Sequence, residues 1–259
     1  MTDYQKLFSL AGKRALITGG TGGLGSQIAA AFLQNGADVA VCGGHPEKAD
    51  PLGELAASLG RRFLALKCNI TKPDEVTVML DQIADSWGGL DILVNSAGIN
   101  RLIRAEEYDD ETFAQVMDLN LNGLHTVTRE VGRRFMIPQN YGRIVNLSSV
   151  KSLIGTTENY IAYCASKGAV NMYTKQLACE WGKYLITVNA IAPTFVRTPI
   201  NSFQLDDPVF YKKLTDRIPL GRIGQEADIA SAALYLSSDA AAFVSGQVLC
   251  VDGGLTAMQ

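Results

Sequence analysis

Short apolar runs alternate along this chain with longer segments in which apolar residues recur at helical spacing. The short runs are typical of β-strands and cover residues 14–18, 38–42, 63–67, 91–94, 142–147, 185–190 and 247–251. The helical segments cover residues 26–35, 47–59, 73–87, 111–136, 160–184 and 226–237. Because parallel strands need crossover connections, this alternation predicts an α/β fold: one doubly wound, Rossmann-type domain. We expect a seven-stranded parallel sheet flanked by helices on both faces, within a single domain spanning residues 1–259.

The composition is typical of a globular protein and excludes several function classes. Hydrophobic residues make up 47% and charged residues 19% of the 259 residues. The net charge of −3 and the absence of a basic block argue against a nucleic-acid partner. The five scattered cysteines and two histidines form no metal-binding motif, so we expect reduced thiols and no metal. No secretory signal or membrane span is evident, and we expect a cytoplasmic protein.

A glycine-rich turn follows the first predicted strand and opens the first predicted helix. Its residues are Gly19, Thr21, Gly22, Gly23, Leu24 and Gly25. Glycines let the backbone approach a pyrophosphate, and a helix N-terminus offers unpaired N–H groups with partial positive charge. A flexible loop is the alternative interpretation. The strand–turn–helix context favours a dinucleotide-binding site.

Polar residues cluster where later strands end, which is where ligands bind in parallel sheets. The fourth strand leads into Asn95, Ala97 and Gly98, and the fifth into Ser148 and Ser149. The sixth strand leads into Pro193, Thr194, Val196 and Thr198. Asn120 lies within a predicted helix. Taken singly, each of these residues also fits a turn, a cap or a core amide.

Tyr163 and Lys167 lie four residues apart in a predicted helix, so their side chains share one face. A free phenol has a pKa of about 10 and is a weak base near neutrality. A fixed cation nearby stabilises the phenolate and lowers that pKa, which suits the pair to proton transfer. An ordinary surface pair is the alternative.

These motifs together resemble the short-chain dehydrogenase/reductase family. TGGTGGLG at 18–25, NSAG at 95–98, Asn120, Ser149, YCASK at 163–167 and PTFVRT at 193–198 occur in the family's order. The resemblance implies an NAD(P)-dependent oxidoreductase acting on CH–OH groups, with Tyr163 transferring the proton. It further implies that Lys167 lowers the Tyr163 pKa and binds the nicotinamide ribose, and that Ser149 holds the substrate oxygen. Asn120 would position the water and backbone that connect Lys167 to solvent.

The family pattern also suggests cofactor contacts, with three departures. Thr198 would face the carboxamide of the nicotinamide, and residues 95–98 would form the surface beneath the cofactor. Asn69 and Ile70 would lie near the adenine. Asn69 stands where an Asp is usual, and Thr194 replaces a Gly. One extra residue separates Ser149 from Tyr163, so we expect the loop 150–162 to bulge, with Ser148 as the alternative contact.

The residues that usually select the cofactor are glycines here. An acid that favours NAD would stand at Gly43, and basic residues that favour NADP would stand at Gly44 or Gly22. His45 and Lys48 are near in sequence but are weak phosphate anchors. We slightly favour NAD over NADP.

Within the family, the chain is most similar to gluconate 5-dehydrogenase-type sugar and polyol dehydrogenases, at its start and at 95–101 and 190–199. The expected substrate is a secondary alcohol or ketone, or the anomeric hydroxyl, of a sugar, a sugar acid or another anionic polyol. Candidate contacts for an anionic group are Asn100, Arg101, Arg104, Lys151 and Arg197, with solvated surface charge as the alternative. The segment 195–217 is a candidate substrate lid.

Two other functions compete with this interpretation. A 3-oxoacyl-acyl-carrier-protein reductase uses the same scaffold, but it would favour NADP and a basic docking patch. A non-catalytic dinucleotide sensor would tend to lack the Tyr or the Lys. By family analogy we expect a homotetramer, with helices 111–136 and 160–182 as candidate interface elements.

Overall fold

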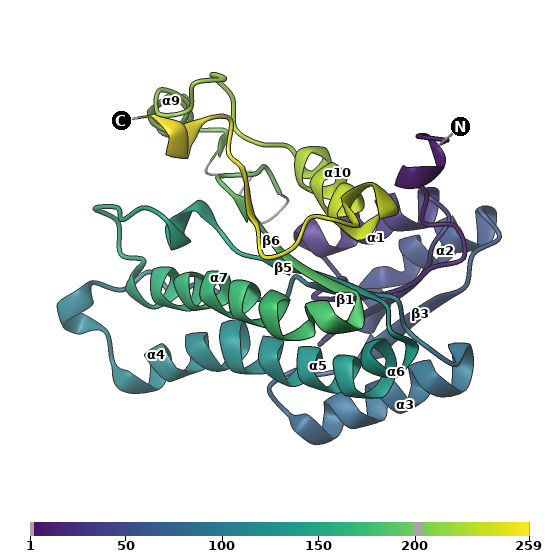
Figure 1. Cartoon of the computed structure of the whole chain (residues 1–259). Helices are drawn as coiled ribbons and strands as arrows, with labels where there is room; N and C mark the ends of the chain where they lie inside the picture. Colours follow the sequence, from purple (N-terminus) through teal and green to yellow (C-terminus); the bar gives the residue numbers. More distant parts are fainter. Residues whose placement is uncertain (1–2, 199–204, 259) are drawn as a thin grey trace.

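The computed structural model describes residues 3–198 and 205–258. Its centre is one seven-stranded parallel sheet in the order β3-β2-β1-β4-β5-β6-β7, which confirms the predicted fold class (Figure 1). The strands are β1 (Arg14–Thr18), β2 (Asp38–Gly43), β3 (Phe63–Lys67), β4 (Ile92–Asn95), β5 (Gly142–Leu147), β6 (Ile186–Pro193) and β7 (Val248–Val251). The order reverses between β1 and β4. A crevice for a ligand forms at such a reversal, because the loops that follow the two strands diverge.

Helices cover both faces of the sheet. They are α1 (Gly23–Gln34), α2 (Asp50–Ser58), α3 (Pro73–Trp87), α4 (Asp110–Met117), α5 (Leu124–Val131), α6 (Ile137–Gln139), α7 (Ile161–Trp181), α9 (Pro208–Thr215) and α10 (Glu226–Ser237). Figure 1 shows α1, α2 and α10 on one face and α3, α5 and α7 on the other. Each layer buries its own apolar cluster against the sheet, with Phe32 and Ile229 in the first and Leu80 and Val131 in the second.

Local sequence signals explain the helix ends that match the prediction. α3 begins at Pro73 with acidic residues in its first turn, and it is followed by Gly88 at φ 70°. α10 begins with a capping box between Gln225 and Asp228. Both helices cover the predicted residues.

Other boundaries differ from the prediction for identifiable reasons. The glycine-rich turn enters the helix directly, so α1 begins at Gly23 rather than at residue 26. β6 continues to Pro193 because that residue pairs with Val251 of β7. Residues 46–49 form a separate 3₁₀ turn before α2. The sequence pattern missed α9, although Asp207 caps it and Pro208 begins it.

The predicted helix 111–136 is not a uniform α-helix. Two π-helical turns, Asp118–Gly123 and Gly132–Met136, separate α4, α5 and α6. Such turns change which side chains face a neighbouring element, and they are frequent at functional sites. Asn120 lies in the first π turn and is buried.

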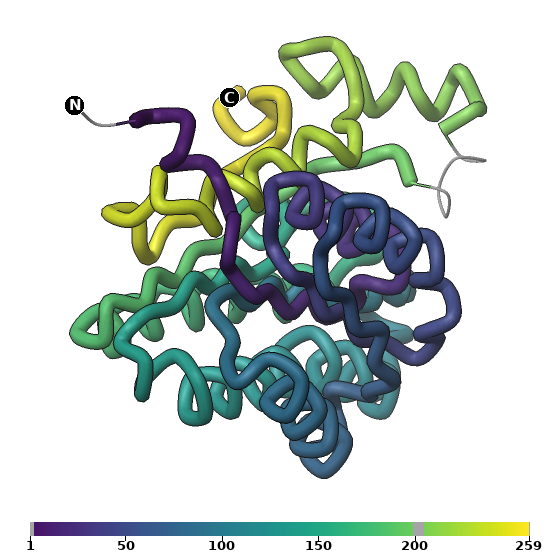
Figure 2. The backbone as a smooth tube through the Cα atoms, turned by 90° about the vertical axis from the view of Figure 1, so that its right-hand side faces the viewer, coloured from purple at the N-terminus to yellow at the C-terminus, as the bar shows by residue number. Residues whose placement is uncertain are grey.

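The remaining short helices are 3₁₀ turns at Lys6–Phe8, Ala105–Glu107, Val150–Ser152, Gly182–Tyr184, Asp239–Ala241 and Leu255–Ala257. Figure 2 shows the C-terminal segment, in yellow, beside the light-green chain that follows α9. There the N–H of Leu220 donates to the carbonyl of Gly253, and Leu255 packs on an apolar cluster that includes Leu214 and Ile218.

Candidate active site

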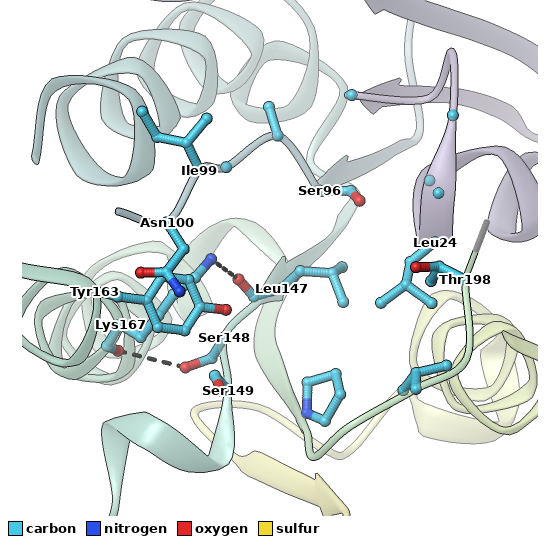
Figure 3. Close-up of a pocket in the computed structure, with 18 of the residues that line it drawn as sticks. Leu24, Ser96, Ile99, Asn100, Leu147, Ser148, Ser149, Tyr163, Lys167 and Thr198 are labelled. Carbon is cyan, nitrogen blue, oxygen red and sulfur yellow. Dashed lines mark hydrogen bonds between the residues drawn. The ribbon is translucent and has the colours of Figure 1, made fainter. Parts of the chain in front are cut away.

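A cavity of about 610 Å³ lies along the carboxyl ends of the strands. Most of the predicted site residues line it: Gly19, Thr21, Gly22, Gly23, Leu24, Gly25, Gly44, His45, Ala97, Gly98, Asn100, Ser149, Lys151, Tyr163, Lys167, Pro193, Thr194, Val196 and Thr198. Figure 3 shows Tyr163 and Lys167 reaching in from α7 on one side, opposite Leu24 and Thr198. The structure therefore brings segments that are distant in sequence to one site.

The backbone of the glycine-rich turn lies close to the backbone of the loop after β4. Gly19 has φ +66°, and a Cβ there would lie 2.9 Å from the backbone of Ala97. A Cβ at Gly22 or Gly23, in contrast, would meet no atom within 4 Å. No acidic side chain stands in the first turn of α1. This open, uncapped helix N-terminus fits the pyrophosphate of a dinucleotide.

At the end of β2, position 43 has no space for the acidic side chain that would select NAD. A Cβ on Gly43 would lie 2.6 Å from Thr21 Oγ1, so a larger residue at 43 would displace the threonine. Gly44, His45 and Lys48 line the cavity, whereas Gly43 does not. His45 Nδ1 lies 3.0 Å from the carboxylate of Glu47. Gly43 thus stays a prediction as a cofactor contact, and among these residues Gly44, His45 and Lys48 are the ones at the cavity.

Lys167 is held in a buried position beside Tyr163. Its side chain is enclosed, with the residue 5% exposed, and its Nζ donates to the carbonyl of Leu147 over 2.6 Å (Figure 3). Nζ lies 5.7 Å from the centre of the Tyr163 ring. Burial lowers the pKa of Lys167 to about 8.

The pKa of Tyr163 moves in the direction opposite to the prediction. Burial raises the pKa of Tyr163, and a hydrogen bond with the Ser149 side chain opposes this shift only in part. Desolvation disfavours the phenolate more than the surrounding groups favour it. The predicted net lowering is therefore wrong for the protein as described.

The two adjacent serines have different partners. Ser149 lines the cavity together with Tyr163, and its Oγ accepts from the N–H of Lys151 over 3.1 Å. Ser148 Oγ instead donates to Asn171 Oδ1 over 2.6 Å and to the carbonyl of Lys167 over 3.3 Å. A 3₁₀ turn at Val150–Ser152 follows Ser149 directly. Ser149 therefore keeps its predicted position, and Ser148 is committed to α7.

Asn120 does not line the cavity but fixes the chain that does. Its Oδ1 accepts from the N–H of Ile99 over 2.8 Å, and its Nδ2 donates to the Ile99 carbonyl over 2.9 Å. Nδ2 also donates to Ser166 Oγ over 3.0 Å. A Cβ on Gly98 would lie 3.2 Å from Asn120 Oδ1 and 3.5 Å from Lys167 Nζ. The π turn thus links the loop after β4 to α7.

Other predicted contacts lie outside the cavity lining. Asn95 is 2% exposed, and its Nδ2 donates to Thr128 Oγ1 and Asn146 Oδ1, which ties β4 to its neighbours. Asn69 is exposed and accepts twice from Thr71. These side chains, together with the buried Ile70 and with Arg101, are absent from the lining.

Sequence reasoning missed several lining residues: Ile99, Leu147, Val150 and Tyr160. Only Tyr160 carried a usable signal, because it precedes Tyr163 by three residues at the start of α7. The two rings lie 6.2 Å apart between centres. The others are apolar or small residues at strand ends, which a sequence does not distinguish from core.

Three further observations concern the described residues alone. No group of three His, Cys, Asp or Glu side chains among them is placed to hold a metal ion. None of the helices in that part of the chain combines enough length with enough apolar residues to span a bilayer. All five cysteines are free thiols.

Comparison with known proteins decides the family. A family model described as enoyl-(acyl carrier protein) reductase matches residues 19–256. A short-chain type dehydrogenase/reductase from Mycobacterium marinum superposes with a TM-score of 0.90 at 33% identity, over 99% of this chain and 100% of that one. The chain belongs to the short-chain dehydrogenase/reductase family. The resemblance seen in the sequence is thereby confirmed.

Members of this short-chain dehydrogenase/reductase family that act on sugars and polyols are among the relatives. Galactitol 2-dehydrogenase (L-tagatose-forming) of Cereibacter sphaeroides is 38% identical over 98% of this chain and 99% of its own. The crystal structure of a gluconate 5-dehydrogenase from Burkholderia cenocepacia in complex with NADP and tartrate has a TM-score of 0.93 at 35% identity, covering 99% of this chain and 100% of that one. The chain is an NAD(P)-dependent oxidoreductase acting on CH–OH groups, as predicted.

Proposed function

We propose that this enzyme interconverts an alcohol and a carbonyl group of a sugar, polyol or sugar acid, with Tyr163 as the acid–base residue. One observation carries the proposal. The hydroxyls of Tyr163 and Ser149 and the ammonium of Lys167 converge in the same cavity that the glycine-rich turn lines. A dinucleotide bound on that turn would have its reactive end directed toward these three groups.

The roles follow from the contacts of each side chain. A bound nicotinamide dinucleotide supplies the hydride chemistry. Ser149 holds the substrate oxygen beside the Tyr163 hydroxyl, because both side chains line the same end of the cavity (Figure 3). Tyr163 takes the alcohol proton during oxidation and returns it during reduction, while the Lys167 ammonium stabilises the phenolate that forms. Asn120 acts indirectly in this proposal, because it holds the loop at Ile99 in place against α7.

The ribose end of the cavity supports the use of both cofactors, with the slight preference for NAD remaining a proposal. None of the described lining residues is a carboxylate, so nothing there repels the 2′-phosphate of NADP. None is an arginine that would bind this phosphate tightly, and His45 is engaged by Glu47. We expect a ratio of specificity constants within about tenfold, which corresponds to roughly 1.4 kcal/mol.

The residues at the substrate end of the cavity support an anionic substrate less strongly than the sequence suggested. Arg104 lies 3.8 Å from Glu107, and Arg197 lies 2.9 Å from Asp206, so both have acidic partners. Neither residue lines the cavity, and Arg101 does not either. Lys151 is the candidate cation that remains at the lining. The names of the relatives include both a neutral polyol and an acid, and they do not separate the two classes.

Three expectations from the sequence remain proposals. Phe195, Val196 and Thr198 line the cavity and precede α9, which supports a lid at 195–217, although residues 199–204 lie outside the described residues. The homotetramer rests on family analogy and is tested by the molar mass in solution. Five unpaired cysteines support a reducing, cytoplasmic location.

The experiment is a survey of NAD and NADP reduction with matched neutral and acidic substrates. The panel pairs D-glucitol with D-gluconate and galactitol with D-galactonate, and it adds aldoses. An acetoacetyl thioester, assayed with NADH and NADPH, represents the acyl-carrier alternative. We expect turnover of at least one sugar, polyol or aldonate. Turnover of the thioester alone, or of no compound by an enzyme that binds the cofactor, would contradict the proposal.

A further inference from the structure

An ion pair stands at the substrate end of the cavity. Lys151 lines the cavity with only 10% of its side chain exposed, and its Nζ lies 3.7 Å from Glu158 Oε2. The ammonium also lies 4.6 Å from the centre of the Tyr160 ring. Burial lowers the pKa of Lys151, and the charge of Glu158 opposes that shift. The Lys151 ammonium thus lines the cavity, and the carboxylate that compensates its charge, Glu158, does not.

Glu158 is fixed in this position by its own loop. Its N–H donates to Thr156 Oγ1 over 2.9 Å, and Thr156 Oγ1 lies within hydrogen-bonding distance, 3.2 Å, of Glu158 Oε2. The other carboxylate oxygen lies 3.8 Å from Lys213 Nζ on α9. The Lys213 side chain is 67% exposed, so water screens its charge. Within the cavity wall, Glu158 therefore mainly offsets the charge of Lys151.

The separation within this pair determines what Lys151 offers a ligand. At 3.7 Å the ion pair is longer than a hydrogen bond, so the N–H groups of the ammonium remain available. A substrate hydroxyl accepts from such an N–H without adding charge. A carboxylate in the same place would lie roughly 6–7 Å from Glu158, given a charge-assisted bond of about 2.8 Å. At an effective dielectric constant near 20, repulsion over that distance lowers the affinity for the carboxylate by roughly ten- to a hundredfold relative to a site with Lys151 alone, and it offsets part of the attraction that Lys151 exerts at about 2.8 Å.

We infer that Glu158 weakens the preference of Lys151 for a carboxylate, so that the substrate end also accepts the hydroxyl groups of an uncharged polyol or sugar. The inference rests on the proposed function and names the substrate class of the same site. Glu158 is the specificity-determining residue, acting through the charge of Lys151 rather than by contact with the substrate.

The test measures kcat/KM of the full-length enzyme for D-glucitol and D-gluconate, and for galactitol and D-galactonate, in wild type and Glu158→Gln. We expect wild type to turn over the polyol of at least one pair. In Glu158→Gln we expect the polyol-to-aldonate ratio to fall at least about tenfold, mainly through a lower KM for the aldonate. The double variant Glu158→Gln/Lys151→Met should lose that gain, because the ammonium that lines the cavity is removed.

The matched control is Glu180→Gln, which removes one negative charge from the exposed C-terminal end of α7, about 26 Å along the helix from Tyr163. Its ratio should equal that of wild type. Wild-type turnover of aldonates alone, or an unchanged ratio in Glu158→Gln, would overturn the inference and leave the proposed function intact. Failure of wild type to turn over any sugar, polyol or aldonate would overturn the proposed function, and this inference with it.

Discussion

The buried ammonium of Lys167 predicts a specific pH dependence of folding stability. Burial lowers its pKa from the ordinary 10.5 to about 8, so the folded protein releases this proton before the unfolded chain does. Below pH 8 the residue is charged in both states, and the folded state carries the full cost of burying the charge. Between pH 8 and 10.5 only the unfolded chain holds the proton, so stability rises with pH.

The size of the effect follows from the two pKa values. A depression from 10.5 to about 8 corresponds to about 3 kcal/mol of destabilisation at neutral pH. Between pH 7.0 and 9.5 the protein should regain about 2 kcal/mol of that amount from this residue alone. Lys167→Met removes the titrating group. It also leaves the carbonyl of Leu147 without its donor, at a cost that does not depend on pH.

The assay is urea unfolding of wild type and Lys167→Met, each at pH 7.0 and 9.5. Other groups that titrate in this range, such as the cysteines, contribute equally to both proteins and cancel in the double difference. We expect the gain between the two pH values to be about 2 kcal/mol smaller in the variant. Equal gains in the two proteins would refute the reasoning that Lys167 is held as a destabilised cation for the chemistry of the site.

Two further substitutions test single features of the cavity. Gly43→Asp should weaken binding of both cofactors, because its Cβ would lie 2.6 Å from Thr21 Oγ1. The double variant Gly43→Asp/Thr21→Ala should recover binding of NAD but not binding of NADP. Equal recovery of the two dissociation constants would contradict this prediction. Ser149→Ala should lower kcat/KM by about a hundredfold or more, while Ser148→Ala should instead lower the free energy of unfolding by about 1 kcal/mol. A larger loss of activity in Ser148→Ala would show that the two serines exchange roles.

The fold was predictable because the signals that set it are local. Strand alternation, Pro73 at the start of α3 and the capping pair of α10 each act within a few residues. The convergence of the site followed from the same pattern, because the carboxyl ends of parallel strands meet at one edge. The missed helix α9 packs in an apolar cluster that includes Phe195 and Leu255, which are more distant in sequence.

What the sequence did not predict depends on burial and on partners that are far away along the chain. The pKa of Tyr163 rises because neighbouring elements remove water, and no local motif reports that. Asn95 is bonded to Asn146 and Thr128 rather than facing a ligand, although the two roles look alike in sequence. The candidate cation Arg197 is paired with Asp206 outside the cavity, while Lys151 lies inside it.

The proton-transfer role of Tyr163 is tested most directly by comparing cofactor binding and turnover in Tyr163→Phe. The variant keeps the aromatic ring and removes only the hydroxyl, at a position that lines the cavity. We predict a cofactor dissociation constant within about threefold of wild type and a kcat lower by about 10²–10⁴-fold. Near-normal turnover by Tyr163→Phe, with the cofactor bound, would contradict the account.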